Sequence, residues 1–247
     1  MKAEVKILIE GYTTADTKAE IGQEKTRPTI SLVKDKNIVM VVDPGVLSSQ
    51  QILIDKLKKE GLTTDDVNMV CITHSHIDHY RNIGMFSKAK TLEYFGLWDN
   101  EEVEDWLEQF TENIQILRTP GHDYTGITLL VTTEIGKIAI CGDVFWQENS
   151  PGNDIYASDQ RELKKSRELV LKMADWIIPG HGPMYKSKYI ISEKPEQKIE
   201  KETLGKCKKC HRQFFEKKDR CECQPWLCYH HCECEDDCDL CNCGHKR

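Results

Sequence analysis

The sequence predicts an α+β domain over residues 1–190, a charged linker over 191–206 and a small cysteine- and histidine-rich module over 207–247. Short apolar runs alternate with amphipathic stretches along the first part, which predicts strands interleaved with helices. A chain of 247 residues with 39% hydrophobic and 30% charged residues can bury one sizeable core and carry an appendage. Ten of the twelve cysteines lie between Cys207 and Cys243, so the end of the chain is predicted to be a separate unit.

Strands and one helix are expected before the middle of the chain. Alternating or continuous apolar character predicts strands over 4–10, 29–33, 36–42 and 67–72. The third of these strands runs into the turn signal Asp43-Pro44-Gly45. Apolar residues at helical spacing predict a helix over 49–60, which Gly61 can end in a left-handed conformation. The strand over 67–72 leads into a histidine cluster, and a helix is expected to follow over 78–86.

The second half of the domain repeats this alternation. Strands are expected over 115–117, 125–132, 137–141 and 176–178, with a helix over 161–173. The strand over 137–141 ends at Gly142-Asp143, and the last strand ends at Pro179-Gly180-His181. Cys71 and Cys141 lie inside apolar runs and are expected to be buried core residues.

The strongest chemical signal is the run Thr73-His74-Ser75-His76-Ile77-Asp78-His79, placed directly after a predicted strand. Alternate residues of an extended segment point the same way, so His74 and His76 can bind one metal ion. Asp78 and His79 turn toward a second ion. Four candidate ligands within six residues are hard to explain without a metal.

Three later residues complete the predicted metal centre. His122 completes the first site and His181 the second. Asp143 is the natural bridge, because the two oxygens of a carboxylate can bind two ions about 3.5–4 Å apart. Such a pair would hold a bridging hydroxide, which is the expected nucleophile.

Three neighbouring residues have less specific roles. Asp43 either caps its turn or orients a ligand histidine from behind the metal centre, and the sequence favours neither. Tyr80 and Arg81 follow the histidine cluster, so a phenol and a cation flank the second site. Both are candidate substrate-binding residues, and Arg81 could attract a phosphate.

Taken in order, these motifs resemble the metallo-β-lactamase superfamily. The histidine cluster looks like its HxHxDH signature, and the remaining motifs are matched by Asp43-Pro44-Gly45, Thr119-Pro120-Gly121-His122, Gly142-Asp143 and Pro179-Gly180-His181-Gly182. The resemblance covers residues 4–185 and is greatest to the metallo-β-lactamase domain-containing protein 1 group, whose animal member is linked to endonucleolytic processing of histone pre-mRNA. It implies a four-layer αβ/βα sandwich with two zinc ions, although some members use iron or manganese.

We therefore expect a dinuclear hydrolase of an ester, thioester or phosphodiester, with Asp78 and Asp143 as its catalytic carboxylates. Arg81 and the resemblance favour a phosphodiesterase or ribonuclease, whereas the net acidity and the absence of a β-CASP insertion disfavour RNA. One alternative is a thioesterase or lactonase of the glyoxalase II type. A second is a mononuclear iron persulfide dioxygenase that uses only His74, His122 and Asp143. A third is an adaptor that acts through its zinc module.

The cysteines at the end of the chain indicate metal thiolates rather than disulfides, because no secretory signal precedes them. Cys207 and Cys210, together with Cys221 and Cys223, supply two ligand pairs compatible with one tetrahedral zinc. More cysteines and histidines follow, so one to three zinc ions are expected in this module. An iron–sulfur cluster also fits the cysteines, but the interspersed histidines favour zinc. A structural or protein-binding role is favoured over an RNA clamp.

Charge and hydropathy limit the expected partners. The formal net charge of -7 excludes a general attraction to nucleic acid or to an anionic membrane, although a local basic groove is compatible with it. The first ten residues lack the apolar core of a secretory signal, and no later run approaches the length of a membrane span. We therefore expect a cytoplasmic protein with no membrane partner.

Overall fold

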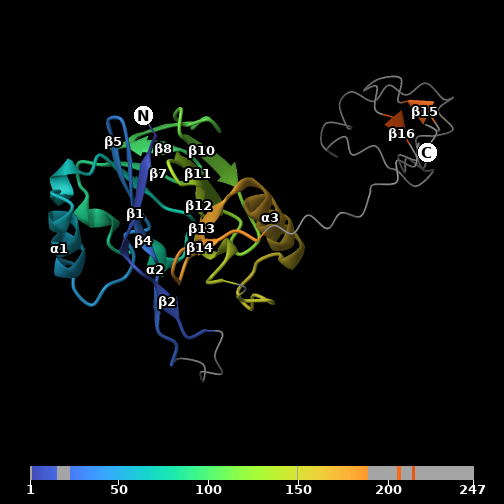
Figure 1. Ribbon diagram of the computed structural model, residues 1–247, viewed down its shortest axis with the longest axis horizontal. Coiled ribbons are helices and arrows are strands. Elements are labelled where there is room, and N and C mark those ends of the chain that lie inside the picture. Colours follow the sequence, from blue (N-terminus) through green and yellow to red (C-terminus); the bar gives the residue numbers. More distant parts are fainter. Residues whose placement is uncertain (1, 16–22, 149, 189–204, 207–212, 215–247) are drawn as a thin grey trace. The chain divides into compact units, whose positions relative to one another are not determined.

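Figure 1 shows the computed structural model, which describes residues 2–15, 23–148, 150–188, 205–206 and 213–214. The chain divides into two units, Met1–Ile190 and Ile191–Arg247. Within the second unit, the described residues form one antiparallel pair, β15 (Gly205–Lys206) with β16 (Gln213–Phe214). The four cysteines expected to bind zinc, Cys207, Cys210, Cys221 and Cys223, lie outside the described residues.

The first unit contains a seven-stranded sheet. Its strands, in spatial order, are β1 (Glu4–Ile9), β4 (Ile30–Asp35), β5 (Ile38–Val42), β6 (Met69–Cys71), β7 (Lys90–Leu92), β8 (Leu97–Asp99) and β9 (Glu102–Glu104). The three central strands β5, β6 and β7 are parallel, and the other neighbours are antiparallel. Parallel neighbours end at the same edge of a sheet, so the loops that follow β5 and β6 lie close together.

The second sheet of this unit has five strands. In spatial order they are β10 (Ile114–Arg118), β11 (Ile127–Thr133), β12 (Gly136–Ile140), β13 (Trp176–Ile178) and β14 (Tyr185–Lys186). Here β12 and β13 are the parallel pair. A separate two-stranded ribbon, β2 (Tyr12–Thr13) with β3 (Thr26–Arg27), leaves the first sheet after β1.

The core between the two sheets is apolar. Met40 and Val42 of β5 are buried in one cluster with Leu129 of β11. Successive residues of a strand point to opposite faces, and the intervening Val41 and Leu130 belong instead to two outer clusters. Each sheet therefore has an apolar outer face that another element must cover.

One helix covers each outer face. α1 (Gln51–Lys59) buries Leu53 and Leu57 against the first sheet. α3 (Gln160–Met173) buries Val170 against the second sheet, and Asp159 caps its first turn by accepting from two backbone N–H groups. Figure 1 shows the two helices on opposite sides with both sheets between them. The order helix, sheet, sheet, helix is the layering that the resemblance implies.

Most expected elements are present within a few residues of their predicted limits, and Cys71 and Cys141 are buried as predicted. The helix expected over 78–86 is wrong. It is divided into α2 (Ile77–Tyr80) and a short 3-10 segment, Ile83–Met85, because the backbone of Asn82 leaves the helical region and its N–H bonds to the carbonyl of Gly45 at 3.1 Å.

The remaining short elements were not predicted. The strands β2, β3, β7, β8, β9 and β14 have two or three residues each, which is too short for a clear periodic pattern. Two further 3-10 turns occupy Thr64–Asp66 and Gly142–Val144. Among the described residues, no helix is both long and apolar enough to cross a membrane.

Candidate metal centre

Polar side chains from both sheets meet at the ends of strands. Asp43 follows β5, His74 and His76 follow β6, His122 follows β10, Asp143 follows β12, and His181 follows β13. α2 carries Asp78 and His79. The loops after strands of two facing sheets thus bring together residues separated by more than a hundred positions in the sequence.

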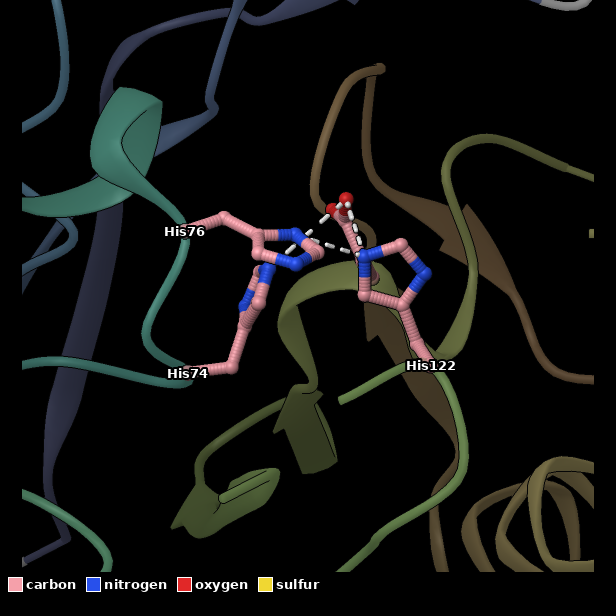
Figure 2. A group of neighbouring side chains, drawn as sticks. His74, His76 and His122 are labelled. Atoms are coloured by element: carbon pink, nitrogen blue, oxygen red, sulfur yellow. Dashed lines mark hydrogen bonds and ion pairs between the residues drawn. The ribbon is translucent and has the colours of Figure 1, made fainter. Parts of the chain in front are cut away.

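The first group consists of His74, His76, His122 and Asp143, whose ligand atoms lie within 4.8 Å of one another. Figure 2 shows the three imidazoles turned toward one another, with dashed lines between their nitrogens and neighbouring atoms. Nε2 of His122 lies 2.9 Å from Nδ1 of His76. These are the four residues expected to hold the first ion, and they can together hold a metal ion.

The second group consists of Asp78, His79 and His181, again with ligand atoms within 4.8 Å of one another. Asp143 lies between this group and the first. Its Oδ2 is 3.3 Å from Nε2 of His122 and 3.2 Å from Nε2 of His181, and its Oδ1 is 3.3 Å from Nε2 of His79. One carboxylate therefore contacts both groups.

Each histidine that presents Nε2 to the cluster has its other nitrogen in contact with a neighbouring group. Nδ1 of His74 lies 3.2 Å from Oγ1 of Thr73, and Nδ1 of His181 lies 3.0 Å from the carbonyl of Arg27. For His79 and His122 the partners are carboxylates, those of Asp43 at 2.9 Å and Asp154 at 2.7 Å. Such contacts fix the orientation of an imidazole and its tautomer, as second contacts of metal-binding histidines do.

The carboxylate of Asp43 contacts His79 at 2.9 Å, which is the second of the two roles that the sequence left open. Asp43 lies in the turn after β5 with a φ of 49°, a conformation that non-glycine residues seldom adopt. Its carboxylate accepts hydrogen bonds from the N–H and hydroxyl of Thr73 at 2.8 and 2.7 Å, besides contacting His79. Asp43 therefore joins the loop after β5 to the loop that carries His74.

Asp154 is a site residue that sequence reasoning missed. It lies in the loop before α3, is almost fully buried, and contacts a candidate ligand, His122. No motif surrounds it, and the local sequence Asn153-Asp154-Ile155 reads as an ordinary loop. Its contact with His122, which exists only in the folded chain, is what marks it as a site residue.

Close backbone packing holds the loop of His181 against that of Asp143. The N–H groups of Gly180 and His181 donate to the carbonyls of Phe145 and Trp146 at 2.9 and 2.7 Å. A methyl group at Gly180 would collide with Oδ1 of Asp143, so this position requires glycine.

The electrostatics of the cluster are those of a buried polar site. Burial, followed by the neighbouring His79, holds the pKa of His74 well below its usual value. Burial alone would raise the pKa of Asp143, but His181 and His79 outweigh it and hold that pKa well below its ordinary value. Burial would lower the pKa of His79, but Asp143 and Asp43 outweigh it and the pKa is raised. The cluster thus favours an ionised carboxylate among imidazoles.

Three buried atoms in this cluster test whether a metal fits. Nε2 of His74, Nε2 of His79 and Oδ1 of Asp143 have no hydrogen-bond partner within the described chain. A buried polar atom without a partner costs about 1–3 kcal/mol, so atoms of this kind call for one. Imidazole and carboxylate are ligands that zinc, iron and manganese accept. The residues therefore fit one or more divalent cations.

The two residues expected to touch substrate are placed differently. Tyr80 is half-buried and packs against the apolar cluster between the first sheet and α1. Arg81 is exposed and lines a cavity that also includes Asp78. Beside the first group, the ring of Trp146 meets that of His122 edge-on, with centroids 6.2 Å apart. Tyr156 packs on Trp146 and donates its hydroxyl to Glu24 at 2.7 Å.

Comparisons with known proteins identify relatives among metal-dependent hydrolases of one superfamily. The family model described as "Metallo-beta-lactamase superfamily" matches residues 26–103. "Metallo-beta-lactamase domain-containing protein 1" of Xenopus laevis is 31% identical over 192 residues, which are 74% of this chain and 81% of the relative. The human protein of that name is 28% identical over 162 residues, 60% of this chain, and the match spans only 59% of its length.

Two further relatives have less specific names. A "Probable metallo-hydrolase" of Methanocaldococcus jannaschii is 28% identical over 158 residues, covering 61% of this chain and 75% of the relative. The crystal structure of a metallo-β-lactamase-type protein from Thermotoga maritima superposes with a TM-score of 0.62 at 23% identity, covering 75% of this chain and all of the other. At that identity the structural match bears on the fold alone.

Proposed function

Because the chain belongs to the metallo-β-lactamase superfamily, we propose that it is a metal-dependent hydrolase with two divalent cations in its active site. The first cation would be held by His74, His76 and His122, and the second by Asp78, His79 and His181. Asp143 would bind both. Zinc suits these ligands best, and iron or manganese is compatible with them.

One observation carries this proposal: Asp143 contacts histidines of both groups, while one of its oxygens and two facing imidazole nitrogens have no hydrogen-bond partner in the described chain. If only the first group held a cation, Nε2 of His79 would have neither a metal ion nor a hydrogen-bond partner among the described residues. The completeness and burial of the second group therefore support two cations over the mononuclear alternative.

The cations, the histidines and the two carboxylates would have different roles in hydrolysis. Bound divalent cations supply Lewis acidity, which polarises a substrate oxygen and lowers the pKa of water toward about 7. The histidines hold fixed orientations through Asp43, Asp154 and the backbone, so little reorganisation is needed during turnover. Asp143 remains ionised between the two groups, and Asp78 lines the cavity through which a substrate can approach.

For the substrate we propose a phosphodiester, RNA included, ahead of thioesters and lactones. The support is the exposed Arg81 beside Asp78, since an arginine matches the geometry of phosphate oxygens. For the module over 207–247 we propose one to three bound zinc ions and a protein partner, on the density of its cysteines.

Metal content tests the dinuclear centre without identifying the substrate. Full-length protein and two variants, Asp143→Ala and His181→Ala, are analysed for metal per chain, so that any metal in the cysteine-rich module cancels in the differences. We expect Asp143→Ala to lose about two equivalents and His181→Ala about one, because one carboxylate serves both ions. Turnover of a phosphodiester, thioester and lactone panel should disappear in Asp143→Ala.

The control replaces an exposed carboxylate of β9, Glu102→Ala, and should change neither metal content nor turnover. Retention of both metal equivalents in Asp143→Ala contradicts the assignment of the bridge. A wild-type chain that carries both metals and hydrolyses nothing in the panel contradicts the proposed activity.

A further inference from the structure

A cavity of about 400 Å³ opens beside the second group of candidate ligands. Its lining combines residues of the β2–β3 ribbon and its connection with residues of α2 and the loop after β5: Tyr12, Glu24, Lys25, Thr26, Val46, Ile77, Asp78 and Arg81. Because Asp78 is among them, a molecule in this cavity lies next to the proposed second cation. The cavity is therefore suited to hold a part of the substrate away from the bond that is cleaved.

Two cations in this lining lack a side-chain partner within the part of the chain that the structure describes. The side chains of Lys25 and Arg81 make no hydrogen bond or ion pair with any other described residue, and both are exposed. Lys36, Lys88 and Lys90 each lie within 3.0 Å of a carboxylate oxygen, whereas Lys58 and Lys59 of α1 resemble Lys25 in making no ion pair with a described residue. Lys25 differs from those two lysines in lining a cavity together with Arg81 and Asp78. In a chain with a net charge of -7, two cations at one cavity that no described carboxylate pairs with are suited to a ligand.

The two carboxylates of the lining offset these charges only in part. Glu24 keeps its negative charge and accepts a hydrogen bond from the hydroxyl of Tyr156 at 2.7 Å. The charge of Asp78 would be offset by the cation that it is placed to bind. With metal present, the lining thus carries two positive side chains, Lys25 and Arg81, against the one remaining negative charge of Glu24.

The ribbon that carries Lys25 is attached to the metal centre. The hydroxyl of Thr26 donates to Oδ2 of Asp78 at 3.1 Å and lies 3.2 Å from Nδ1 of His181. The guanidinium of Arg27 lies over the ring of Tyr12, 5.0 Å from its centroid. These contacts fix the position of Lys25 and Tyr12 relative to the candidate ligands.

Resting on the proposed function, we propose that Lys25 and Arg81 bind an anionic group of the substrate, a carboxylate or a phosphate, while the bond to be cleaved lies at the metal centre. The preferred substrates then carry a second negative charge a few bonds from the scissile group. Lysine and arginine are the side chains that pair most strongly with such groups.

The test uses equilibrium binding, which does not depend on turnover. Full-length, zinc-loaded protein is titrated by calorimetry with succinate, glutarate and adipate, and with the matching monocarboxylates propionate, butyrate and pentanoate. In each pair one carboxylate can bind the metal centre, so the difference in affinity reports the second charge. We expect at least one dicarboxylate to bind about tenfold more tightly than the matching monocarboxylate. This factor is at the lower end of the range for a charge-assisted hydrogen bond, because both cations are exposed to water.

Variants assign this preference to residues. Lys25→Ala and Arg81→Ala should each reduce it, and the double variant should remove it, whereas Lys88→Ala, which removes a paired surface lysine, should leave it unchanged. Titration with 3-phosphonopropionate against propionate distinguishes the two sources of charge, because a phosphate site prefers the phosphonate over succinate. All variants change exposed side chains, and circular dichroism verifies that they fold.

Two results overturn the inference: no dicarboxylate binds more tightly than its partner, or the preference persists in the double variant. Either result leaves the proposed hydrolase intact if the substrate panel is turned over. Conversely, a preference that depends on Lys25 and Arg81 in a protein that hydrolyses nothing would support the anion site and contradict the hydrolase.

Discussion

At the scale of single residues, the candidate ligands depend on the groups behind them. Asp154 directly contacts a histidine of the first group and Asp43 a histidine of the second, while Asp43 reaches His74 of the first group only through the hydroxyl of Thr73. Loss of such a supporting contact generally weakens metal binding by about 10–100-fold. The two groups can therefore be disturbed separately by substitutions that leave every candidate ligand in place.

We expect Asp154→Asn to weaken the first cation and Asp43→Asn the second, each by about tenfold, because asparagine keeps the shape but loses the charge that orients the imidazole. Each substitution is made in two backgrounds: His181→Ala, which disables the second group, and His76→Ala, which disables the first. Competition with a fluorescent zinc chelator measures the remaining affinity. Equal weakening by both substitutions in both backgrounds would contradict the division.

The candidate ligands could be chosen from the sequence because each one follows an apolar strand or belongs to the compact histidine run. Asp154 could not, since its role comes from burial against His122 after the loop before α3 has folded. The cavity lined by Lys25 and Arg81 could be predicted only in part. Arg81 directly follows the histidine cluster in the sequence. Lys25 reaches the cavity through the β2–β3 ribbon, whose strands are too short to predict.

At the scale of elements, the site is made by loops that pack tightly on one another at the ends of the sheets. The loop after β13 donates two backbone hydrogen bonds to the loop after β12, and Gly180 leaves room for the carboxylate of Asp143. The regular elements follow from hydrophobic period, and so their positions were predictable. The end of α2 at Tyr80 could not be predicted, because it depends on a tertiary hydrogen bond from Asn82 to Gly45.

Gly180→Ala should displace either Asp143 or the loop of His181, because the added methyl group and Oδ1 of Asp143 cannot occupy the same space. We expect metal retention after dialysis to fall by about tenfold and the unfolding free energy to drop by about 1–3 kcal/mol, as overpacking does. Gly152→Ala is the matched control, since nothing lies near the position of its added methyl group. Unaltered metal retention in Gly180→Ala would show that the loop adapts freely.

At the scale of the whole molecule, the chain combines a layered α+β unit with a second unit, Ile191–Arg247. Every residue proposed to bind the catalytic metals or the substrate belongs to the first unit. The abundance of cysteines in the second was evident in the sequence, but spacing alone does not fix which of them share a metal. The two units are therefore expected to bind metal independently.

Deleting residues 191–247 should leave a folded protein with basal hydrolysis, because no core residue of either sheet is removed. Elemental analysis of the full and shortened chains should differ by one to three zinc ions, the number that the cysteines can bind as tetrahedral sites. Activity that disappears while circular dichroism and metal content of the shortened chain remain normal would place part of the second unit in catalysis.

The position of Asp143 also matters for the lifetime of the protein. This carboxylate comes from one sheet, whereas His74 and His79 come from the other side of the sandwich. An ion bound among them joins the two halves, and any ligand that binds only the native state raises its stability, by about 4 kcal/mol at a thousand times its dissociation constant. A cell that lacks the ion would then contain less folded protein, in addition to losing the activity.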